Sequence, residues 1–204
     1  MPTALITGGT SGIGAAFARA LAERGHDLVL VARDAERLSA CADEFTERYG
    51  VHVEILPADL AVPADVQRVA DRLESSERPV DVLVNNAGYG LHVKLLDDKP
   101  DEHRRAIDVM CLAVLVLGGA AGRAMKARGH GLIINIASLA AYISQGAYSP
   151  IKAYVLAYSE GLANELHGTG VTVTAVNPGW VKTEFHQRAG IKTSSIPDFI
   201  CIQQ

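Results

Sequence analysis

Short apolar runs alternate with longer amphipathic segments along most of this chain. The short runs are rich in β-branched residues and predict strands at residues 3–7, 27–32, 51–56, 80–84, 131–137 and 171–177. The longer segments carry apolar residues at helical spacing and predict helices at residues 12–24, 35–49, 63–75, 101–128 and 149–167. The runs at 80–84 and 132–134 are almost continuously apolar, which is typical of parallel strands covered on both faces.

This alternation predicts an α/β fold with a doubly wound parallel sheet, similar to the Rossmann arrangement. We see no internal repeat, low-complexity tract or flexible linker, so residues 1–204 are expected to form a single domain. A chain of 204 residues is long enough to bury a core without disulfides or bound metal.

Composition and charge narrow the class of protein. The formal net charge of −4 gives no electrostatic reason to expect nucleic-acid binding. The three cysteines, Cys41, Cys111 and Cys201, suggest neither a disulfide framework nor a metal site and suit the cytoplasm. No leader sequence is evident, and the longest uncharged run, residues 109–122, is shorter than the roughly 20 residues that span a bilayer. We therefore expect a cytoplasmic protein with no membrane span.

A glycine-rich loop follows the first predicted strand. Gly8, Gly12 and Gly14 allow a tight turn and close approach of the backbone to a pyrophosphate, which the start of the next helix can bind through its N–H groups. Arg33 ends the second strand, where an arginine suits the 2′-phosphate of NADP. Asp34 follows directly and would suit the ribose of NAD, so the sequence favours NADP and leaves NAD open.

The candidate catalytic residues are Ser138, Tyr148 and Lys152. Tyr148 and Lys152 are four residues apart on a predicted helix and so share one face. A nearby ammonium is expected to lower the pKa of the phenol from its reference value of about 10. A phenol tuned in this way can pass a proton to or from a substrate oxygen.

The motifs occur in a characteristic order: the glycine loop, Asn85-Asn86-Ala87-Gly88, Ser138, Tyr148-x-x-x-Lys152 and Asn177-Pro178-Gly179. Together they resemble the short-chain dehydrogenase/reductase family, over residues 3 to 185. The resemblance implies that Tyr148 is the general acid/base, that Lys152 tunes it and holds the nicotinamide ribose, and that Ser138 binds the substrate oxygen. Asp59 matches an adenine-contacting aspartate, and Asn85, Ala87 and Gly88 would line the adenosine. Pro178, Gly179 and Thr183 match the segment beside the nicotinamide amide. The implied cofactor-binding residues are Gly8, Thr10, Ser11, Gly12, Ile13, Gly14, Arg33, Asp59, Leu60, Asn86, Ala87, Gly88, Tyr148, Lys152, Pro178, Gly179, Val181 and Thr183.

The chain departs from the family pattern in two places. Met110 stands where the family usually has a catalytic asparagine, and a thioether cannot donate the hydrogen bonds of an amide. In the family a water held by the backbone carbonyl at this position links to the lysine, so a proton relay can survive the change. The chain also ends at Gln204, so the substrate-side segment, residues 185–204, looks truncated and the family's last strand is in doubt.

The first functional hypothesis is an NADP(H)-dependent oxidoreductase that interconverts a carbonyl and a secondary alcohol. The apolar composition of residues 183–200 favours an apolar small-molecule substrate, and a homo-oligomer is left open. The alternative is a dinucleotide-binding sensor or regulator whose chemistry is impaired by Met110 and the short C-terminal segment. A third interpretation is an unstable truncation product. The sequence does not identify the substrate or the stereochemistry of the reaction.

Overall fold

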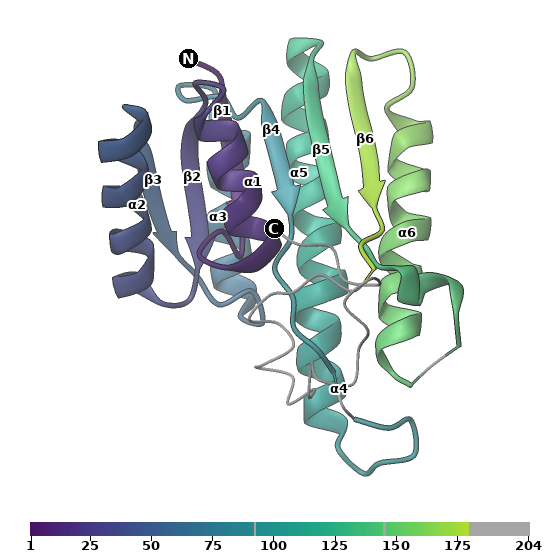
Figure 1. Ribbon diagram of the computed structural model, residues 1–204. Helices are drawn as coiled ribbons and strands as arrows, with labels where there is room; N and C mark the ends of the chain where they lie inside the picture. Colours follow the sequence, from purple (N-terminus) through teal and green to yellow (C-terminus); the bar gives the residue numbers. More distant parts are fainter. Residues whose placement is uncertain (92, 145, 180–204) are drawn as a thin grey trace.

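The computed structural model describes residues 1–91, 93–144 and 146–179. Within these ranges the strands form one parallel sheet in the order β3-β2-β1-β4-β5-β6 (Figure 1). The strands are β1 (Thr3–Thr7), β2 (Asp27–Ala32), β3 (Val53–Pro57), β4 (Val82–Asn85), β5 (Gly131–Ile136) and β6 (Val171–Val176). The doubly wound parallel sheet predicted from the sequence is confirmed. Residues 185–204, and with them the question of a further strand, lie outside the described residues.

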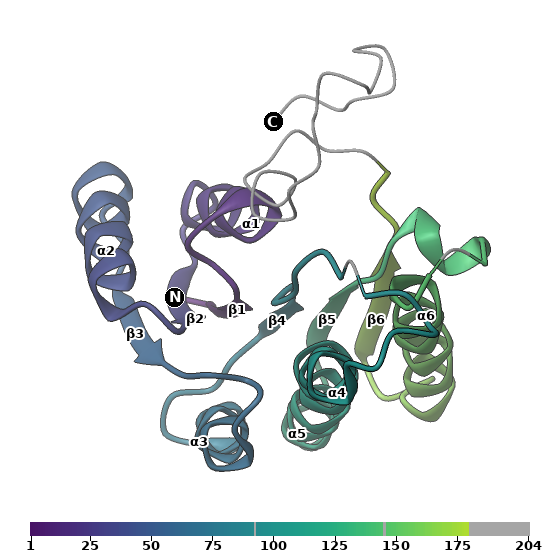
Figure 2. The ribbon, with the colours of Figure 1, turned by 90° about the horizontal axis from the view of Figure 1, so that it is seen from below.

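Helices cover both faces of this sheet (Figure 2). On one face lie α1 (Gly12–Ala22) and α2 (Ala35–Tyr49), and on the other lie α3 (Pro63–Glu74), α5 (Ala113–Arg128) and α6 (Tyr148–Glu165). Successive side chains of a strand point to opposite faces. Ile6 therefore joins the core beneath α1 and α2, while its neighbour Leu5 joins the core beneath α3 and α5. Burial on both faces explains why the strand sequences are continuously apolar.

β3 and β4 begin two residues later than the sequence predicts. The backbone N–H of His52 donates to the Asp27 side chain at 2.9 Å. At the start of β1, the N–H of Thr3 donates to the Asp81 carboxylate, also at 2.9 Å. At the amino-terminal ends of the strands, side-chain oxygens thus bind backbone N–H groups. The pairing of β4 with β1 starts only at Val82.

The helix predicted at 101–128 is interrupted near its middle. It consists of α4 (Pro100–Ile107), a π-helical turn η1 (Asp108–Leu112) and α5. The N–H of Ala113 donates to the carbonyl of Asp108, five residues back, which defines the wider turn. An amphipathic pattern does not distinguish a π turn from α-helix, so the sequence pattern does not predict this turn. Turns of this kind occur often at functional sites, and this one contains Met110.

The segment Pro100–Arg128 is long and apolar enough to cross a membrane by length and composition alone. However, 61% of its apolar window is buried inside the fold. Its hydropathy is therefore that of a core helix, which packs against α3 and the sheet.

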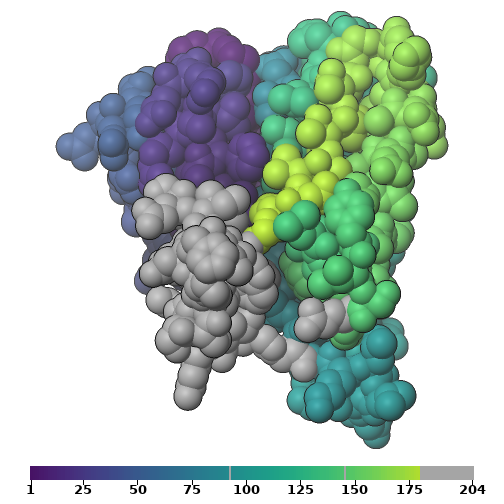
Figure 3. Space-filling model, turned by 45° about the vertical axis from the view of Figure 1, so that its right-hand side comes forward, coloured from purple at the N-terminus to yellow at the C-terminus, as the bar shows by residue number. Residues whose placement is uncertain are grey.

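The strand order reverses between β1 and β4, since β1 pairs with β2 on one side and β4 on the other. Open α/β sheets bind ligands beyond the carboxyl ends of the strands at such a point. The strand arrows in Figure 1 all point to this edge, where the glycine loop, the start of α6 and α4 also lie. In Figure 3, α1 (purple) and the β6–α6 unit (yellow and green) both extend down towards the carboxyl edge of the sheet.

Candidate functional site

The loop between β1 and α1 is shaped by its glycines. Gly8 and Gly12 adopt positive φ angles of 67° and 53°, a region that favours glycine. A Cβ at Gly14 would overlap the Gly8 carbonyl oxygen and the Asn86 side chain. Ser11 is the N-cap of α1, but its side chain makes no capping hydrogen bond. The first N–H groups of α1 therefore remain available to an anion held in the loop of Gly8, Thr10, Ser11, Gly12, Ile13 and Gly14.

Asn86 fastens the glycine loop to the turn after β4. Its amide nitrogen donates to the carbonyl oxygens of Thr7 at 2.9 Å and Gly8 at 3.2 Å. The Thr7 hydroxyl accepts hydrogen bonds from the N–H groups of Asn86 and Ala87, both at 3.0 Å. Gly8 lies so close to Ala87 that the two segments form one surface. The structure thus brings together the glycine loop and residues 86–88, as the sequence motifs predict.

Asn85 points elsewhere, although the family resemblance grouped it with the adenosine-lining residues. Only 4% of Asn85 is exposed, and its amide donates to the Asn135 side chain at 2.9 Å. Asn135 in turn donates to the Ser159 hydroxyl at 2.9 Å. Asn85 therefore belongs to a buried chain of hydrogen bonds that joins β4, β5 and α6. Because side chains alternate along a strand, Asn85 and Asn86 leave the backbone in different directions.

Arg33 and Asp34, at the end of β2, have separate environments. The Asp34 carboxylate accepts a 3.0 Å hydrogen bond from the N–H of Arg37 and so caps the start of α2. Arg33 is exposed at the carboxyl edge. Asp34, the acidic residue that would suit NAD, thus caps α2. Arg33, which would suit NADP, is the charged group exposed at the carboxyl edge of the sheet.

Asp59 follows β3 and is bound by an arginine that the sequence did not single out. Arg105 of α4 donates from Nη2 to both carboxylate oxygens, at 3.1 and 2.8 Å. Partial burial raises the pKa of Asp59, but hydrogen bonds from Arg105 and from the Ala61 N–H outweigh it and hold the pKa below its usual value. The Leu60 side chain is buried in the core, so only the backbone of Leu60 lies near the edge.

Tyr148 begins α6, and Lys152 lies one turn later. The Lys152 ammonium donates to the Ile136 carbonyl oxygen at 2.8 Å and lies 5.6 Å from the centroid of the Tyr148 ring. The two side chains thus share a helix face, as their spacing predicts. The electrostatic expectation was wrong, because burial dominates. Burial raises the pKa of the Tyr148 phenol above its usual value and lowers the pKa of Lys152 to about 8.

Ser138 follows β5 and is the N-cap of a short 3₁₀ helix, η2 (Leu139–Tyr142), which packs against α6. Its hydroxyl oxygen accepts a 3.1 Å hydrogen bond from the Ala140 N–H, so the hydroxyl proton is directed elsewhere. The N–H of Leu139 donates to the Pro178 carbonyl at 3.0 Å. This bond places Pro178 and Gly179, after β6, beside Ser138. Val181 and Thr183 lie outside the described residues.

The π-helical turn η1 lies between the residue 86–88 turn and α6. Met110 is 1% exposed, and its sulfur would lie 3.2 Å from a Cβ at Gly88. The Cys111 thiol points the other way, towards the Ile151 carbonyl of α6 at 3.9 Å, and burial raises its pKa to about 11. Met110 therefore fills space beneath the candidate cofactor surface, in a position where it offers no hydrogen-bond donor.

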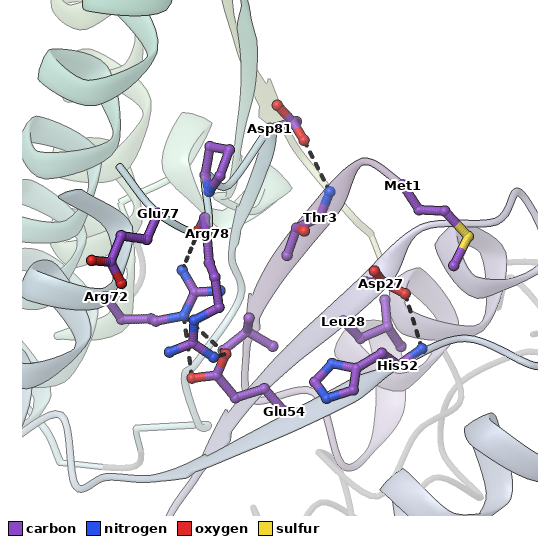
Figure 4. A pocket seen from close by; sticks show the side chains of 12 residues that line it. Met1, Thr3, Asp27, Leu28, His52, Glu54, Arg72, Glu77, Arg78 and Asp81 are labelled. Atoms are coloured by element: carbon purple, nitrogen blue, oxygen red, sulfur yellow. Dashed lines mark hydrogen bonds and ion pairs between the residues drawn. The ribbon is translucent and has the colours of Figure 1, made fainter. Parts of the chain in front are cut away.

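Two further hollows lie among the described residues, one far from this site and one beside it. One is a cavity of about 260 Å³ at the opposite edge of the sheet, where Glu54 pairs with both Arg72 and Arg78 (Figure 4). The lining also contains Asp27, Glu77 and Asp81, so charged groups of both signs face this cavity. The other is an apolar groove of about 390 Å³ between η1 and the start of α6, lined by Ile107, Cys111, Leu112 and Ile151 among others.

A family model for short chain dehydrogenases matches residues 2–193. The 3-oxoacyl-[acyl-carrier-protein] reductase of Escherichia coli is 33% identical over 197 residues, which cover 92% of this chain and 79% of that protein. A short-chain dehydrogenase from Sphingobium yanoikuyae, solved in complex with NADPH, is 39% identical with a TM-score of 0.94, and the match covers 100% of this chain and 79% of that one. The L-sorbose reductase from Gluconobacter frateurii, complexed with NADPH and L-sorbose, is 34% identical with a TM-score of 0.84, over 89% of this chain and 70% of that one.

Proposed function

Because the chain belongs to the short-chain dehydrogenase family, we propose that it is an NADP(H)-dependent oxidoreductase that interconverts a carbonyl and a secondary alcohol. The observation that carries this proposal is the placing of Tyr148 and Lys152 on one face of α6, at the sheet edge where the glycine loop opens. We further propose that residues 1–204 act as one domain, with residues 185–204 on the substrate side.

The residues at the edge fit a dinucleotide. The uncapped start of α1 offers N–H groups to a pyrophosphate, and the space that a Cβ at Gly14 would fill lets the loop lie close to it. Arg33, exposed after β2, would bind the 2′-phosphate of NADP, while Asp34 caps α2. Two of the similar solved structures are complexes with NADPH, which supports NADP over NAD. When bound, this cofactor supplies or accepts the hydride.

The side chains of the chain itself transfer the proton. With its pKa raised by burial, Tyr148 is a neutral phenol at physiological pH and can donate its proton to a substrate carbonyl oxygen as that oxygen gains negative charge. At neutral pH Lys152 is still protonated, so its charge lies beside the ring as the phenolate forms. Ser138 would orient the substrate oxygen through its hydroxyl proton. A neutral phenol favours carbonyl reduction as the working direction.

We also propose a class of substrate, an assembly and a location. The sequence favours an apolar carbonyl compound, and the apolar segment on which this rests lies outside the described residues. Ile107 of α4, Leu112 of η1 and Leu115 of α5 are 45%, 50% and 43% exposed, which agrees with a homo-oligomer. Light scattering of the purified chain would test the oligomeric state. A cytoplasmic location agrees with the free thiols Cys41 and Cys111.

A second candidate function rests on Met110. The buried thioether replaces the family's asparagine, so the chain would be a dinucleotide-binding sensor if that amide were indispensable. Titration of NADPH fluorescence, followed by NADPH oxidation with a panel of ketones and aldehydes, separates the two functions. Turnover of any carbonyl compound supports the enzyme. Tight NADPH binding with no turnover across the panel would support the sensor instead.

A further inference from the structure

We propose that Arg105 is a positioning residue for the adenine end of the cofactor, acting by clamping the Asp59 carboxylate in one orientation. The proposal rests on the dinucleotide-binding part of the function proposed above. The two residues are 46 positions apart in the sequence, and their contact joins the end of β3 to α4. Because Arg105 lies outside the sequence motifs that predict the rest of the site, only the structure reveals this contact.

The Asp59 carboxylate is held from two directions. Its Oδ1 accepts the N–H of Ala61 at 3.0 Å and the Arg105 guanidinium at 3.1 Å. Its Oδ2 accepts the same Arg105 nitrogen at 2.8 Å. The backbone N–H of Asp59 donates to the Asp65 carboxylate at 2.7 Å, which fixes the main chain as well. Any rotation of the Asp59 carboxylate would therefore break at least one of these hydrogen bonds.

The clamp leaves one acceptor site unused. Each carboxylate oxygen offers about two lone pairs. Among the described residues, Oδ1 accepts two hydrogen bonds and Oδ2 accepts one. Oδ2 can therefore accept a further N–H donor without losing the ion pair. The exocyclic amine of adenine is such a donor, and an ionised carboxylate is the stronger acceptor for it. Because the pKa of Asp59 is held low, the carboxylate stays ionised over the whole neutral range.

Arg105 itself is rigidly placed by its helix. The next residue, Ala106, is completely buried in the core with Val109 and Leu117, which fixes the rotation of α4 about its axis. The side chains of Arg105 and Asp59 are 41% and 30% exposed, so the pair is open to solvent on one side and a ligand can reach it. A partly exposed pair of this kind contributes little to stability. Its geometry, a guanidinium bridging both oxygens of a carboxylate beside an unused lone pair, suits recognition better than stabilisation.

The test compares ligands that contain adenosine with one that does not. We would titrate wild type, Arg105→Gln and the matched control Arg104→Gln with NADPH, with 2′,5′-ADP and with reduced nicotinamide mononucleotide. Arg104 precedes Arg105 on α4, is exposed, and carries the same charge. We expect Arg105→Gln to weaken NADPH and 2′,5′-ADP by about tenfold, the effect of one charge-assisted contact. The dissociation constant for the mononucleotide should stay unchanged, and Arg104→Gln should bind all three ligands like wild type.

Further variants keep the test decisive. Asp59→Asn should weaken 2′,5′-ADP as Arg105→Gln does, and the double variant should add little to either, since both act through one group. Thermal unfolding checks each variant; if Arg105→Gln fails to fold, Arg105→Lys takes its place, with an intermediate loss expected. Equal loss of all three ligands, or 2′,5′-ADP affinity within twofold of wild type, would overturn the proposal. These are binding measurements. A lack of turnover would therefore contradict the proposed catalysis but would not bear on the proposed role of Arg105. A wild-type chain that binds no adenosine ligand would overturn both.

Discussion

The Lys152 ammonium donates a 2.8 Å hydrogen bond to the carbonyl oxygen of Ile136, the last residue of β5. The bond ties α6 to the sheet at the height of Tyr148, and it is made by a side chain that is only 5% exposed. Burying an ammonium costs free energy even when it is hydrogen-bonded, and this cost appears in the lowered pKa of Lys152. Helix α6 is thus positioned by a group whose burial reduces the stability of the fold.

That cost predicts a pH dependence of stability. Below pH 8 both the folded and the unfolded chain carry the Lys152 proton, so the penalty is full and constant. Between pH 8 and 10.5 the folded chain has lost this proton while the unfolded chain keeps it, and the free energy of unfolding therefore rises with pH. In urea titrations, wild type should gain roughly 1.4 kcal/mol per pH unit over Lys152→Met in this window. Tyr148 acts with the opposite sign, but only above pH 10, where the unfolded chain loses the phenol proton first. Parallel stability curves for wild type and Lys152→Met would show that Lys152 is not penalised by burial.

Gly14→Ala should close the space for the pyrophosphate. The added methyl group would overlap the Gly8 carbonyl oxygen and the Asn86 amide, so the loop must move. We expect NADPH affinity to fall by at least about tenfold, measured by fluorescence titration. Gly161→Ala in α6 is the matched control, because its Cβ meets no atom within 4 Å. That variant should bind NADPH normally and gain up to roughly 1 kcal/mol of stability. Unchanged NADPH binding by Gly14→Ala would mean that the loop does not hold the phosphates.

Arg33→Ala should change the cofactor preference. Loss of a charge-assisted contact to the 2′-phosphate costs roughly 1.5–3 kcal/mol, which corresponds to a ten- to hundredfold higher dissociation constant for NADPH. NADH lacks this phosphate, so its dissociation constant should hardly change. Arg19→Ala removes the same charge from the last turn of α1 and serves as the control. Equal losses for both cofactors would indicate that Arg33 shapes the loop and does not recognise the phosphate.

Substitutions of Met110 separate the enzyme from the sensor. Met110→Leu keeps a buried apolar side chain beside Gly88 and should cost less than about 1.5 kcal/mol of stability. If the side chain takes no part in proton transfer, Met110→Leu should also keep kcat within a few-fold of wild type. Met110→Asn buries an amide in an apolar site and should destabilise the chain by roughly 1–3 kcal/mol in urea titrations. A gain of turnover in Met110→Asn, from a wild-type chain with none, would favour the sensor.

The parts of the site that sequence alone predicts are those set by local spacing. The glycine loop and the Tyr148–Lys152 pair each lie within one turn or one helix, so residue type and separation determine their geometry. Arg105 and Asp59 meet only because the fold brings the loop after β3 to α4, and no local pattern reports such a contact. The buried parallel strands followed from the apolar runs, whereas the π turn at Met110 did not, since its burial pattern resembles that of α-helix.

The electrostatics were predicted less well than the positions. A tyrosine and a lysine four residues apart suggest mutual charge stabilisation, but the sign of each pKa shift depends on how deeply the pair is buried. In the structure both shifts favour the neutral forms. Likewise, two adjacent asparagines in one motif have different partners: Asn86 binds the glycine loop, and Asn85 binds Asn135 within the sheet.

Tyr148→Phe tests the central claim, that the Tyr148 hydroxyl transfers the proton, most directly. The substitution removes one hydroxyl and keeps the ring that packs beside Lys152. With the best carbonyl substrate from the panel, kcat for NADPH-dependent reduction should fall by at least about a hundredfold, the usual contribution of a general acid. The dissociation constant for NADPH should remain within about twofold of wild type. A Tyr148→Phe variant that binds NADPH normally and retains kcat within a few-fold of wild type would contradict the account.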